Sequence, residues 1–208
     1  MITVERHVAI VLAAGGSLRL GRAKQLLTRD GETLVHRTVR LTRETYPARL
    51  LVVVGARQDD VIEAVDDLKC DVVVNSAWAQ GLSSSLHTAS LALGHHFGPV
   101  LLLGCDQPAL TLDHLQQLIS AAAASDRGYA ATELDGRLGS PAVIPGGVLR
   151  YVERLRGDHG LAIRLNELPA SHVVRVPAPD LRFDIDDEAD LRRAIERGWV
   201  DSEELRVW

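Results

Sequence analysis

Continuous apolar runs alternate with amphipathic segments through the first half of the chain. Four runs consist almost entirely of valine, leucine, isoleucine and alanine, at residues 8–13, 50–55, 72–74 and 100–103. Three segments carry apolar residues at helical spacing, at residues 33–45, 59–68 and 82–93. Apolar runs without polar alternation are typical of parallel strands that helices cover on both faces. The pattern predicts an α/β protein with a three-layer, doubly wound, mostly parallel sheet, and such sheets bind ligands at the carboxyl ends of their strands.

The pattern is less regular after residue 110. We expect helices at residues 113–124, 148–154, 161–168 and 188–197, and strands at residues 129–132, 138–144 and 173–176. Asp158 is a candidate N-cap for the helix at 161–168, and Gly198 is placed to end the last helix. A polar turn is expected at Asp135-Gly136, between the first two of these strands.

The chain has 208 residues, which suits one large domain or two small ones. No repeat or linker divides it. We expect a single domain over residues 1–208, with a first half at 1–110, a second half at 111–198 and a tail at 199–208. The tail contains two tryptophans, and either docks on the domain or meets a partner.

Composition narrows the possible partners and location. The formal net charge of −5 disfavours nucleic acid or an anionic membrane as a general partner. Cys70 and Cys105 are far apart and form no metal-spaced pair, as in reduced cytosolic proteins. The first residues lack the apolar segment of a signal peptide, and no apolar run is long enough to span a membrane. We expect a cytoplasmic protein.

A glycine-rich, basic segment follows the first apolar run, and residues 12–27 have the sequence LAAGGSLRLGRAKQLL. Glycines at 15, 16 and 21 allow close approach of backbone N–H groups to an anion, while Arg19 and Lys24 add positive charge. The spacing is neither that of a P-loop nor that of the dinucleotide fingerprint. The segment predicts a cradle for nucleotide phosphates. The alternative is a turn that only joins strand to helix.

The remaining pattern, L-A-A-G-x-S-x-R-x-G-x-x-K-x-L-L, resembles the signature of the MobA-like nucleotidyltransferases, and its wording is most similar to molybdenum cofactor cytidylyltransferases (MocA-like). The resemblance implies a Rossmann-like nucleotidyltransferase fold of the glycosyltransferase-A-like type. It also implies catalytic roles for Arg19 and Lys24. The implied nucleotide contacts in this segment are Leu12, Ala13, Ala14, Gly15, Gly16 and Ser17. Ala14 stands where guanylyltransferase relatives usually have glycine, which favours a cytosine nucleotide.

Asp106 follows the apolar run at 100–103 directly and is our first candidate for a metal ligand. An acid at the carboxyl end of a central parallel strand faces the same sheet edge as the glycine-rich segment. Nucleotidyl transfer needs Mg²⁺ to neutralise charge on the α-phosphate and on the departing pyrophosphate. Asp106-Gln107-Pro108 resembles the family's metal-binding motif. The alternative is an Asp that only caps the turn before Pro108.

A second acidic segment, Asp184-Ile185-Asp186-Asp187-Glu188, resembles the family's D-I-D-T-P-E-D-L, with Asp187 and Glu188 in place of Thr-Pro. Alternate residues of an extended segment face the same side, so Asp184 and Asp186 can point at one ion. The alternative is that Asp186 or Asp187 serves only as a helix N-cap.

Polar residues at the start of the helix at 82–93 are candidates for the nucleoside site. The segment around Trp78 resembles the family's N-x-x-W-x-x-G-[ML]-x-x-S-[LM], which lies near the base. The implied contacts are Asn75, Gly81, Ser83 and Ser84. The alternative is that Ser83 only caps the helix and Trp78 belongs to the core.

The candidates for acceptor binding lie in the second half. Gly139-Ser140-Pro141 stands where similar cytidylyltransferases have Gly-His-Pro, and Asp158 and Gly160 resemble the family's G-D-x-G loop. Ser140 replaces the family's histidine, which leaves the acceptor open.

These observations together predict an Mg²⁺-dependent enzyme that transfers CMP from CTP to a phosphorylated acceptor and releases pyrophosphate. By resemblance the acceptor is the molybdenum cofactor carried by molybdopterin. Transfer of GMP, or a sugar phosphate or other small phosphate as acceptor, is the alternative within the enzyme class. A carrier that delivers finished cofactor to a client molybdoenzyme is the alternative outside it. An NAD(P)-using oxidoreductase is disfavoured by the broken glycine fingerprint.

Overall fold

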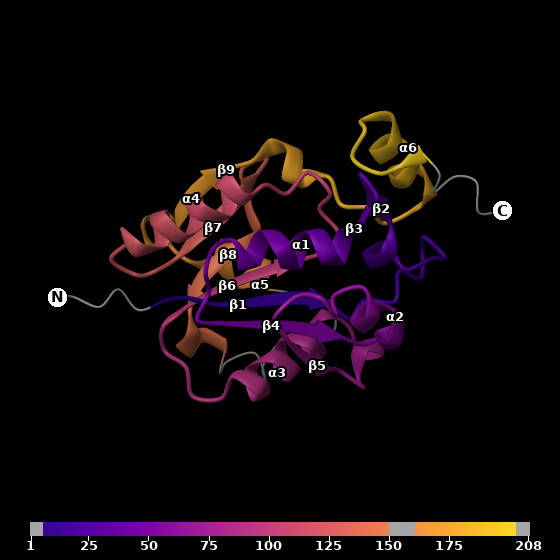
Figure 1. The fold of residues 1–208 in the computed structure, drawn as a ribbon. Coiled ribbons are helices and arrows are strands. Elements are labelled where there is room, and N and C mark those ends of the chain that lie inside the picture. Colours follow the sequence, from indigo (N-terminus) through magenta and orange to yellow (C-terminus); the bar gives the residue numbers. More distant parts are fainter. Residues whose placement is uncertain (1–5, 150–160, 203–208) are drawn as a thin grey trace.

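The computed structural model describes residues 6–149 and 161–202, and its centre is a seven-stranded sheet (Figure 1). In spatial order the strands are β5 (Asp71–Val74), β4 (Arg49–Val54), β1 (Val8–Ala13), β6 (Pro99–Gly104), β8 (Arg137–Pro145), β7 (Ala130–Leu134) and β9 (Val174–Pro177). Neighbouring strands are parallel except that β8 runs antiparallel to both β6 and β7. The predicted mostly parallel sheet is confirmed.

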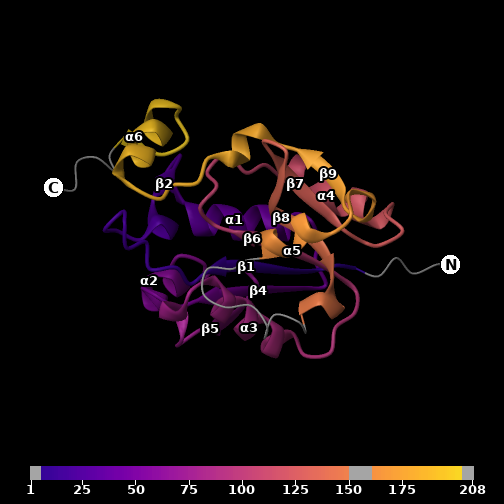
Figure 2. The ribbon, with the colours of Figure 1, turned by 180° about the vertical axis from the view of Figure 1, so that it is seen from behind.

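Helices cover both faces of the sheet. One face packs against α1 (Leu34–Arg43), α2 (Gln58–Glu63) and α4 (Leu112–Ala123). The other packs against α3 (Leu82–Leu93) and α5 (Leu161–Glu167), which Figure 2 shows from behind. Ile10 and Val11 are both fully buried, because successive side chains of β1 point into opposite cores. This is the three-layer, doubly wound arrangement expected from the continuous apolar runs.

A third, smaller apolar cluster includes residues of α6 (Glu188–Glu196), the helix that Figure 1 shows near the C-terminal end of the described chain. Its buried members are Leu20, Leu27, Leu34, Ile185, Leu191, Ala194 and Val200. Next to it lies a hairpin of β2 (Thr28–Arg29) and β3 (Glu32–Thr33), which the apolar pattern did not indicate. Two-residue strands carry too few apolar positions to show a period.

The first residues of the predicted tail contact this part of the fold. The carboxylate of Asp201 accepts hydrogen bonds from the backbone N–H groups of Asp30 and Gly31 at 2.8 and 2.9 Å. Trp199 packs edge-on against Phe183, with ring centroids 5.4 Å apart. The tail therefore begins by docking on the domain, while residues 203–208 lie outside the described residues.

Two predicted helices differ from the structure. α2 ends at Glu63, and the chain continues through tighter turns in which Val65 N–H donates to Ile62 and Leu68 N–H to Val65. Val65 still reaches the core from these turns, so the apolar spacing did not separate them from a longer helix. Where a helix is predicted at 148–154, residues 148–149 belong to a 3-10 turn formed by residues 146–149, and residues 150–154 lie outside the described residues. Within the described ranges, no helix has the length and apolar character needed to cross a membrane.

Candidate active site

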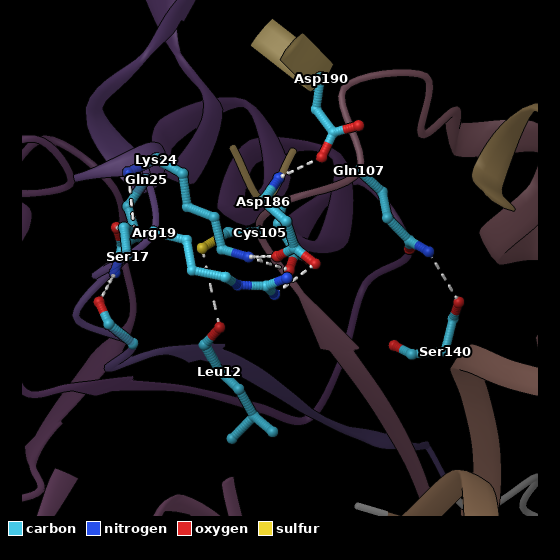
Figure 3. Close-up of polar contacts among 12 residues, drawn as sticks. Leu12, Ser17, Arg19, Lys24, Gln25, Cys105, Gln107, Ser140, Asp186 and Asp190 are labelled. Atoms are coloured by element: carbon cyan, nitrogen blue, oxygen red, sulfur yellow. Dashed lines mark hydrogen bonds and ion pairs between the residues drawn. The ribbon is translucent and has the colours of Figure 1, made fainter. Parts of the chain in front are cut away.

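The glycine-rich segment folds back on itself after β1. Gln25 is buried, and its side-chain amide donates to the carbonyls of Ala13 at 3.0 Å and Gly15 at 2.6 Å. The Ser17 hydroxyl donates to Gln25 Oε1 at 3.4 Å and accepts from the backbone N–H of Lys24 at 3.1 Å (Figure 3). These bonds set the path of the loop and direct Lys24 back toward the sheet. The sequence indicated no role for Gln25 except that a polar residue stands directly before Leu26 and Leu27.

Two glycines of this loop have identifiable structural reasons. A Cβ on Gly16 would lie 2.6 Å from the Trp78 ring, so only glycine allows the indole to pack there. Gly21 has a φ of +74°, which favours glycine. A Cβ on Gly15 would meet nothing within 4 Å, so there is open space beside this residue. Trp78 also packs against the core under α3 and α5. It therefore belongs to this core and contacts the glycine-rich loop as well.

The candidate nucleoside residues after β5 form a hydrogen-bonded turn. Asn75 is buried, and its amide donates to the hydroxyls of Ser84 at 2.9 Å and Ser85 at 3.0 Å. The Ser84 hydroxyl in turn donates to the carbonyl of Gly81 at 2.8 Å. Gly81 is the N-cap residue of α3, with no side-chain capping bond, so Ser83 does not cap the helix. Because Trp78 lies on Gly16, this turn is adjacent to the glycine-rich loop.

Lys24 joins the two predicted acidic segments. Its Nζ lies 2.7 Å from Asp106 Oδ2 and 3.3 Å from Asp186 Oδ1, although these residues are 82 and 162 positions away in the chain (Figure 3). An Arg19 guanidinium nitrogen lies 2.7 Å from the other Asp186 oxygen. The Lys24 side chain is 17% exposed, whereas that of Arg19 is 72% exposed. The structure therefore brings four predicted site residues together: Arg19, Lys24, Asp106 and Asp186.

The alternative roles of the late aspartates are now separated. Asp187 is the N-cap of α6, where it accepts from the backbone N–H of Asp190 in a capping box. Asp186 faces Arg19 and Lys24 instead, and only its backbone N–H contacts the Asp190 carboxylate. Asp186 is therefore not a helix cap.

The charges of this cluster perturb one another. Burial alone would lower the pKa of Lys24, but the Asp106 and Asp186 carboxylates outweigh burial and hold it well above its ordinary value. Asp184 is exposed as a whole residue, but its carboxyl group is largely surrounded by protein atoms. This desolvation raises the pKa of Asp184 to about 7, and the charges of Asp106 and Asp186 contribute further. Burial, together with the Asp106 charge, raises the pKa of the Cys105 thiol to about 12, which agrees with a structural role for this cysteine.

Gln107 ties the Asp106 loop to its neighbours. Its amide nitrogen donates to the carbonyls of Leu181, at 2.7 Å, and Ser140, at 3.1 Å. Arg29 braces the same loop through the carbonyl of Pro108 at 2.7 Å, and the Asp106 carbonyl accepts from Ile185 N–H at 3.4 Å. Gln107 belongs to the Asp106-Gln107-Pro108 motif, but the sequence indicated no role for it because its partners come from distant segments.

The structure describes three of the five candidate acceptor residues. Gly139, Ser140 and Pro141 lie within β8, and a Cβ on Gly139 would approach Leu134 to 2.9 Å, which gives this glycine a packing reason. Ser140 contacts Gln107 through its carbonyl, and its hydroxyl is buried without a partner among the described residues. Asp158 and Gly160 lie outside the described residues.

The carboxylates of the site have the chemistry to hold a hard divalent ion. Among the residues that the structure describes, no three His, Cys, Asp or Glu side chains form a ready-made metal cage. Mg²⁺ is usually held by one or two carboxylates together with phosphate oxygens and water, so such a cage is not required. Asp106, Asp184 and Asp186 supply carboxylate oxygens whose mutual repulsion a cation would relieve.

Named proteins resemble this chain over most of its length. A protein of Opitutus terrae named "probable molybdenum cofactor guanylyltransferase" is 31% identical over 170 residues, which cover 81% of this chain and 82% of that protein. A protein of Paenarthrobacter nicotinovorans named "nicotine blue oxidoreductase" is 30% identical over 167 residues, which cover 77% of this chain and 81% of that one.

Solved structures share the fold. Rv0371c from Mycobacterium tuberculosis superposes with a TM-score of 0.78 at 28% identity, covering 94% of this chain and all of that one. A structure of Rv0371c in complex with manganese superposes at 0.73, with 26% identity and coverage of 92% and 98%. Residues 9–173 match the family described as the MobA-like NTP transferase domain. The family match over residues 9–173 and the likeness to the Opitutus protein place the chain in the MobA-like NTP transferase family of nucleotidyltransferases.

Proposed function

We propose that this nucleotidyltransferase moves CMP from CTP to the molybdenum cofactor carried by molybdopterin, with Mg²⁺ and with release of pyrophosphate. The observation that carries the proposal is the meeting of Lys24 and Arg19 with Asp106 and Asp186 beside the loop after β1. Basic groups for a triphosphate and carboxylates for its metal thus occupy one place, as nucleotidyl transfer requires.

The loop and the turn after β5 are the proposed nucleotide site. Gly15, Ser17 and Arg19 bind the triphosphate, and Lys24 bridges it to the acceptor phosphate. The nucleoside lies against the remaining candidates: Leu12, Ala13, Ala14, Gly16, Asn75, Gly81, Ser83 and Ser84. Open space beside Gly15 and the absence of a side-chain cap on α3 support access to backbone N–H groups here.

The attacking group is a phosphate oxygen of the acceptor, already ionised at pH 7, so no side chain has to remove a proton. The oxygen forms a bond to the α-phosphorus of CTP as the bond to pyrophosphate breaks. Asp106, with Asp184 or Asp186, would hold Mg²⁺, which supplies charge neutralisation on the phosphates when bound. Arg19 and Lys24 stabilise the charge on the transferred and departing groups.

In this proposal residues 1–110 of a single domain hold the nucleotide and residues 111–198 hold the acceptor. Gly139, Ser140, Pro141, Asp158 and Gly160 border the acceptor. Ser140 in place of histidine keeps other phosphorylated acceptors, including sugar phosphates, within the proposal. Cytoplasmic location stays a prediction from the sequence.

Pyrophosphate release tests the proposal. The protein is incubated with Mg²⁺ and each nucleoside triphosphate in turn, with and without molybdopterin carrying molybdenum. We expect release only with acceptor present and fastest with CTP, because Ala14 replaces glycine. Faster release with GTP would favour the guanylyltransferase activity in the name of the Opitutus relative. Binding of the cofactor without consumption of any triphosphate would favour a carrier that serves a client molybdoenzyme.

A second candidate function is reduction of a dye-like substrate with a nicotinamide cofactor. It is favoured by the likeness to the protein named nicotine blue oxidoreductase. The matched assay follows the oxidation of NADH and NADPH in the presence of nicotine blue. Cofactor oxidation without pyrophosphate release in the first assay would replace the transferase proposal.

A further inference from the structure

The two cations proposed to bind phosphate are already bound to the carboxylates proposed to bind metal. Lys24 Nζ lies between Asp106 and Asp186, at 2.7 and 3.3 Å, and Arg19 covers the remaining Asp186 oxygen at 2.7 Å. Asp106 and Asp186 side chains keep 29% and 39% of their exposure, so these pairs are open to exchange with a ligand. Without ligand, the site neutralises itself.

This pairing opposes either ligand when it arrives alone. A divalent cation would meet the ammonium group of Lys24 at the same carboxylate oxygens that it needs, and like charges at such distances repel. A triphosphate would have to draw Lys24 and Arg19 away and leave Asp106 and Asp186 without partners, which costs free energy for partly buried charges.

The two ligands together remove both costs. The metal replaces Lys24 at the carboxylates, and the triphosphate receives the released Lys24 and Arg19. We infer that Lys24 is an internal counter-ion standing in for the metal, so that metal and nucleotide bind with positive coupling through an exchange of its partners. This inference rests on the proposed metal and phosphate sites, and it concerns binding, not turnover.

The test measures Mn²⁺ binding to the protein by the loss of the electron paramagnetic resonance signal of free Mn²⁺, relative to protein-free solutions with the same Mn²⁺ and nucleotide, because the nucleotide itself binds Mn²⁺. The proteins are the wild type, Lys24→Met, Lys24→Arg and Lys69→Met, each with and without CTP, and with GTP in parallel. Lys69, the only other lysine in the chain, is exposed and serves as the matched control. For the wild type we expect weak Mn²⁺ binding alone and an affinity increase of about 5-fold to 150-fold with nucleotide, the usual range of such coupling.

Lys24→Met is expected to bind Mn²⁺ alone about tenfold tighter than the wild type or more, with the nucleotide effect reduced. Lys24→Arg keeps the positive charge and Lys69→Met leaves the site unchanged, so both are expected to bind Mn²⁺ alone with the affinity of the wild type. An equal gain in Lys24→Arg, or none in Lys24→Met, overturns the inference. Arg19→Met removes an exposed cation, leaves the core intact and is expected to give a smaller gain in the same direction, so it decides the question if Lys24→Met unfolds.

The result also separates this inference from the proposed function. Equal Mn²⁺ affinity in the wild type and Lys24→Met, with pyrophosphate release intact in the wild type, overturns the inference alone. Failure of Mn²⁺ to bind any of the proteins, with or without nucleotide, overturns the metal-dependent function and the inference together.

Discussion

At the scale of single residues, the site depends on charges that compensate one another in partly buried surroundings. Lys24 keeps its proton because two carboxylates face it. Asp184 holds a proton more tightly than an ordinary aspartate, mainly because its carboxyl group is shielded from water and also because two other carboxylates lie near it. Removing one member leaves the others with altered charge and only a small loss of packing. Substitutions here are therefore expected to change binding and rate more than stability.

Asp106→Asn tests this expectation. The amide keeps the shape of the side chain but loses the charge that would neutralise a metal. We expect turnover to fall by about 1,000-fold or more, which corresponds to several kcal/mol of transition-state stabilisation. Pyrophosphate release gives the rate, and thermal unfolding checks that the melting temperature stays nearly unchanged. Asp126→Asn, an exposed loop position, is the control. Retained turnover in Asp106→Asn would remove Asp106 from the metal role.

At the scale of elements, buried polar side chains set how neighbouring segments meet. Gln25 holds the glycine-rich loop to the end of β1, and Gln107 holds the segment before Asp184 to the Asp106 loop and β8. Glu32 in β3 makes a similar junction with α1. These contacts join segments that have no common hydrophobic period.

Gln107→Ala is expected to loosen residues 181–186, which lead into and begin the acidic segment. The variant loses two amide hydrogen bonds and leaves the carbonyls of Leu181 and Ser140 unpaired, at a cost of about 1–3 kcal/mol. Hydrogen exchange should rise selectively in residues 181–186, and Mn²⁺ affinity in the presence of nucleotide should fall. Gln117→Ala, which removes an exposed amide on α4, should change neither. Unchanged exchange in the acidic segment of Gln107→Ala would show that Gln107 does not position it.

Glu32 gives a pH dependence to stability. Two hydrogen bonds from Arg40, both 2.8 Å, and one from His36 at 2.6 Å lower its pKa from 4.5 to about 2. Because the folded pKa is depressed, the stabilisation is present above about pH 4.5 and disappears as the pH falls toward 2. Glu32→Gln should cost about 1–2 kcal/mol at pH 7 in urea unfolding, and less at pH 3.

Glu44→Gln is the control for this measurement. Glu44 is the more exposed partner of Arg40, with a single bond at 2.9 Å, so its loss should cost less than about 1 kcal/mol. A cost for Glu32→Gln that stays constant between pH 7 and pH 3 would contradict the assignment.

At the scale of the whole molecule, three apolar cores position different parts of the candidate site. The two large cores fix the sheet and hence the ends of β1 and β6. The third cluster packs Leu20 and Leu27 of the glycine-rich loop against Ile185 and α6. The third cluster therefore links the loop with the acidic segment. A substitution that loosens this cluster should lower the affinity for nucleotide.

Leu191→Ala tests this link against Leu118→Ala. Both leucines are fully buried, Leu191 on α6 in the third cluster and Leu118 on α4 in the core that α1, α2 and α4 cover. Each substitution should cost about 2–5 kcal/mol through lost burial and a cavity. At a temperature where both variants stay folded, only Leu191→Ala should lose nucleotide affinity, measured by calorimetry. Equal loss in the two variants would show that the third cluster has no special connection with the site.

The local pattern was sufficient for most of the fold because its signals are short-range. Continuous apolar runs predicted β1, β4 and β6, and helical spacing with Thr33 and Asp187 as N-caps accounts for α1 and α6. The basic glycine-rich loop, the aspartate after β6 and the acidic segment before α6 marked the candidate site residues through their types and spacing. The helix α2 was predicted too long, because the tight turns after Glu63 keep a helix-like apolar spacing. The β2–β3 hairpin was missed, because two-residue strands carry almost no period.

The partners of these residues came from folding alone. Lys24 meets Asp106 and Asp186 across 82 and 162 positions, and Gln107 meets Leu181 across 74. Such pairings depend on strand order and on the third cluster, and neither leaves a mark in the spacing of a single chain. The chain's residue types thus supplied the cations and the acids of the site, whereas the packing of distant segments determined that the cations and acids neutralise one another.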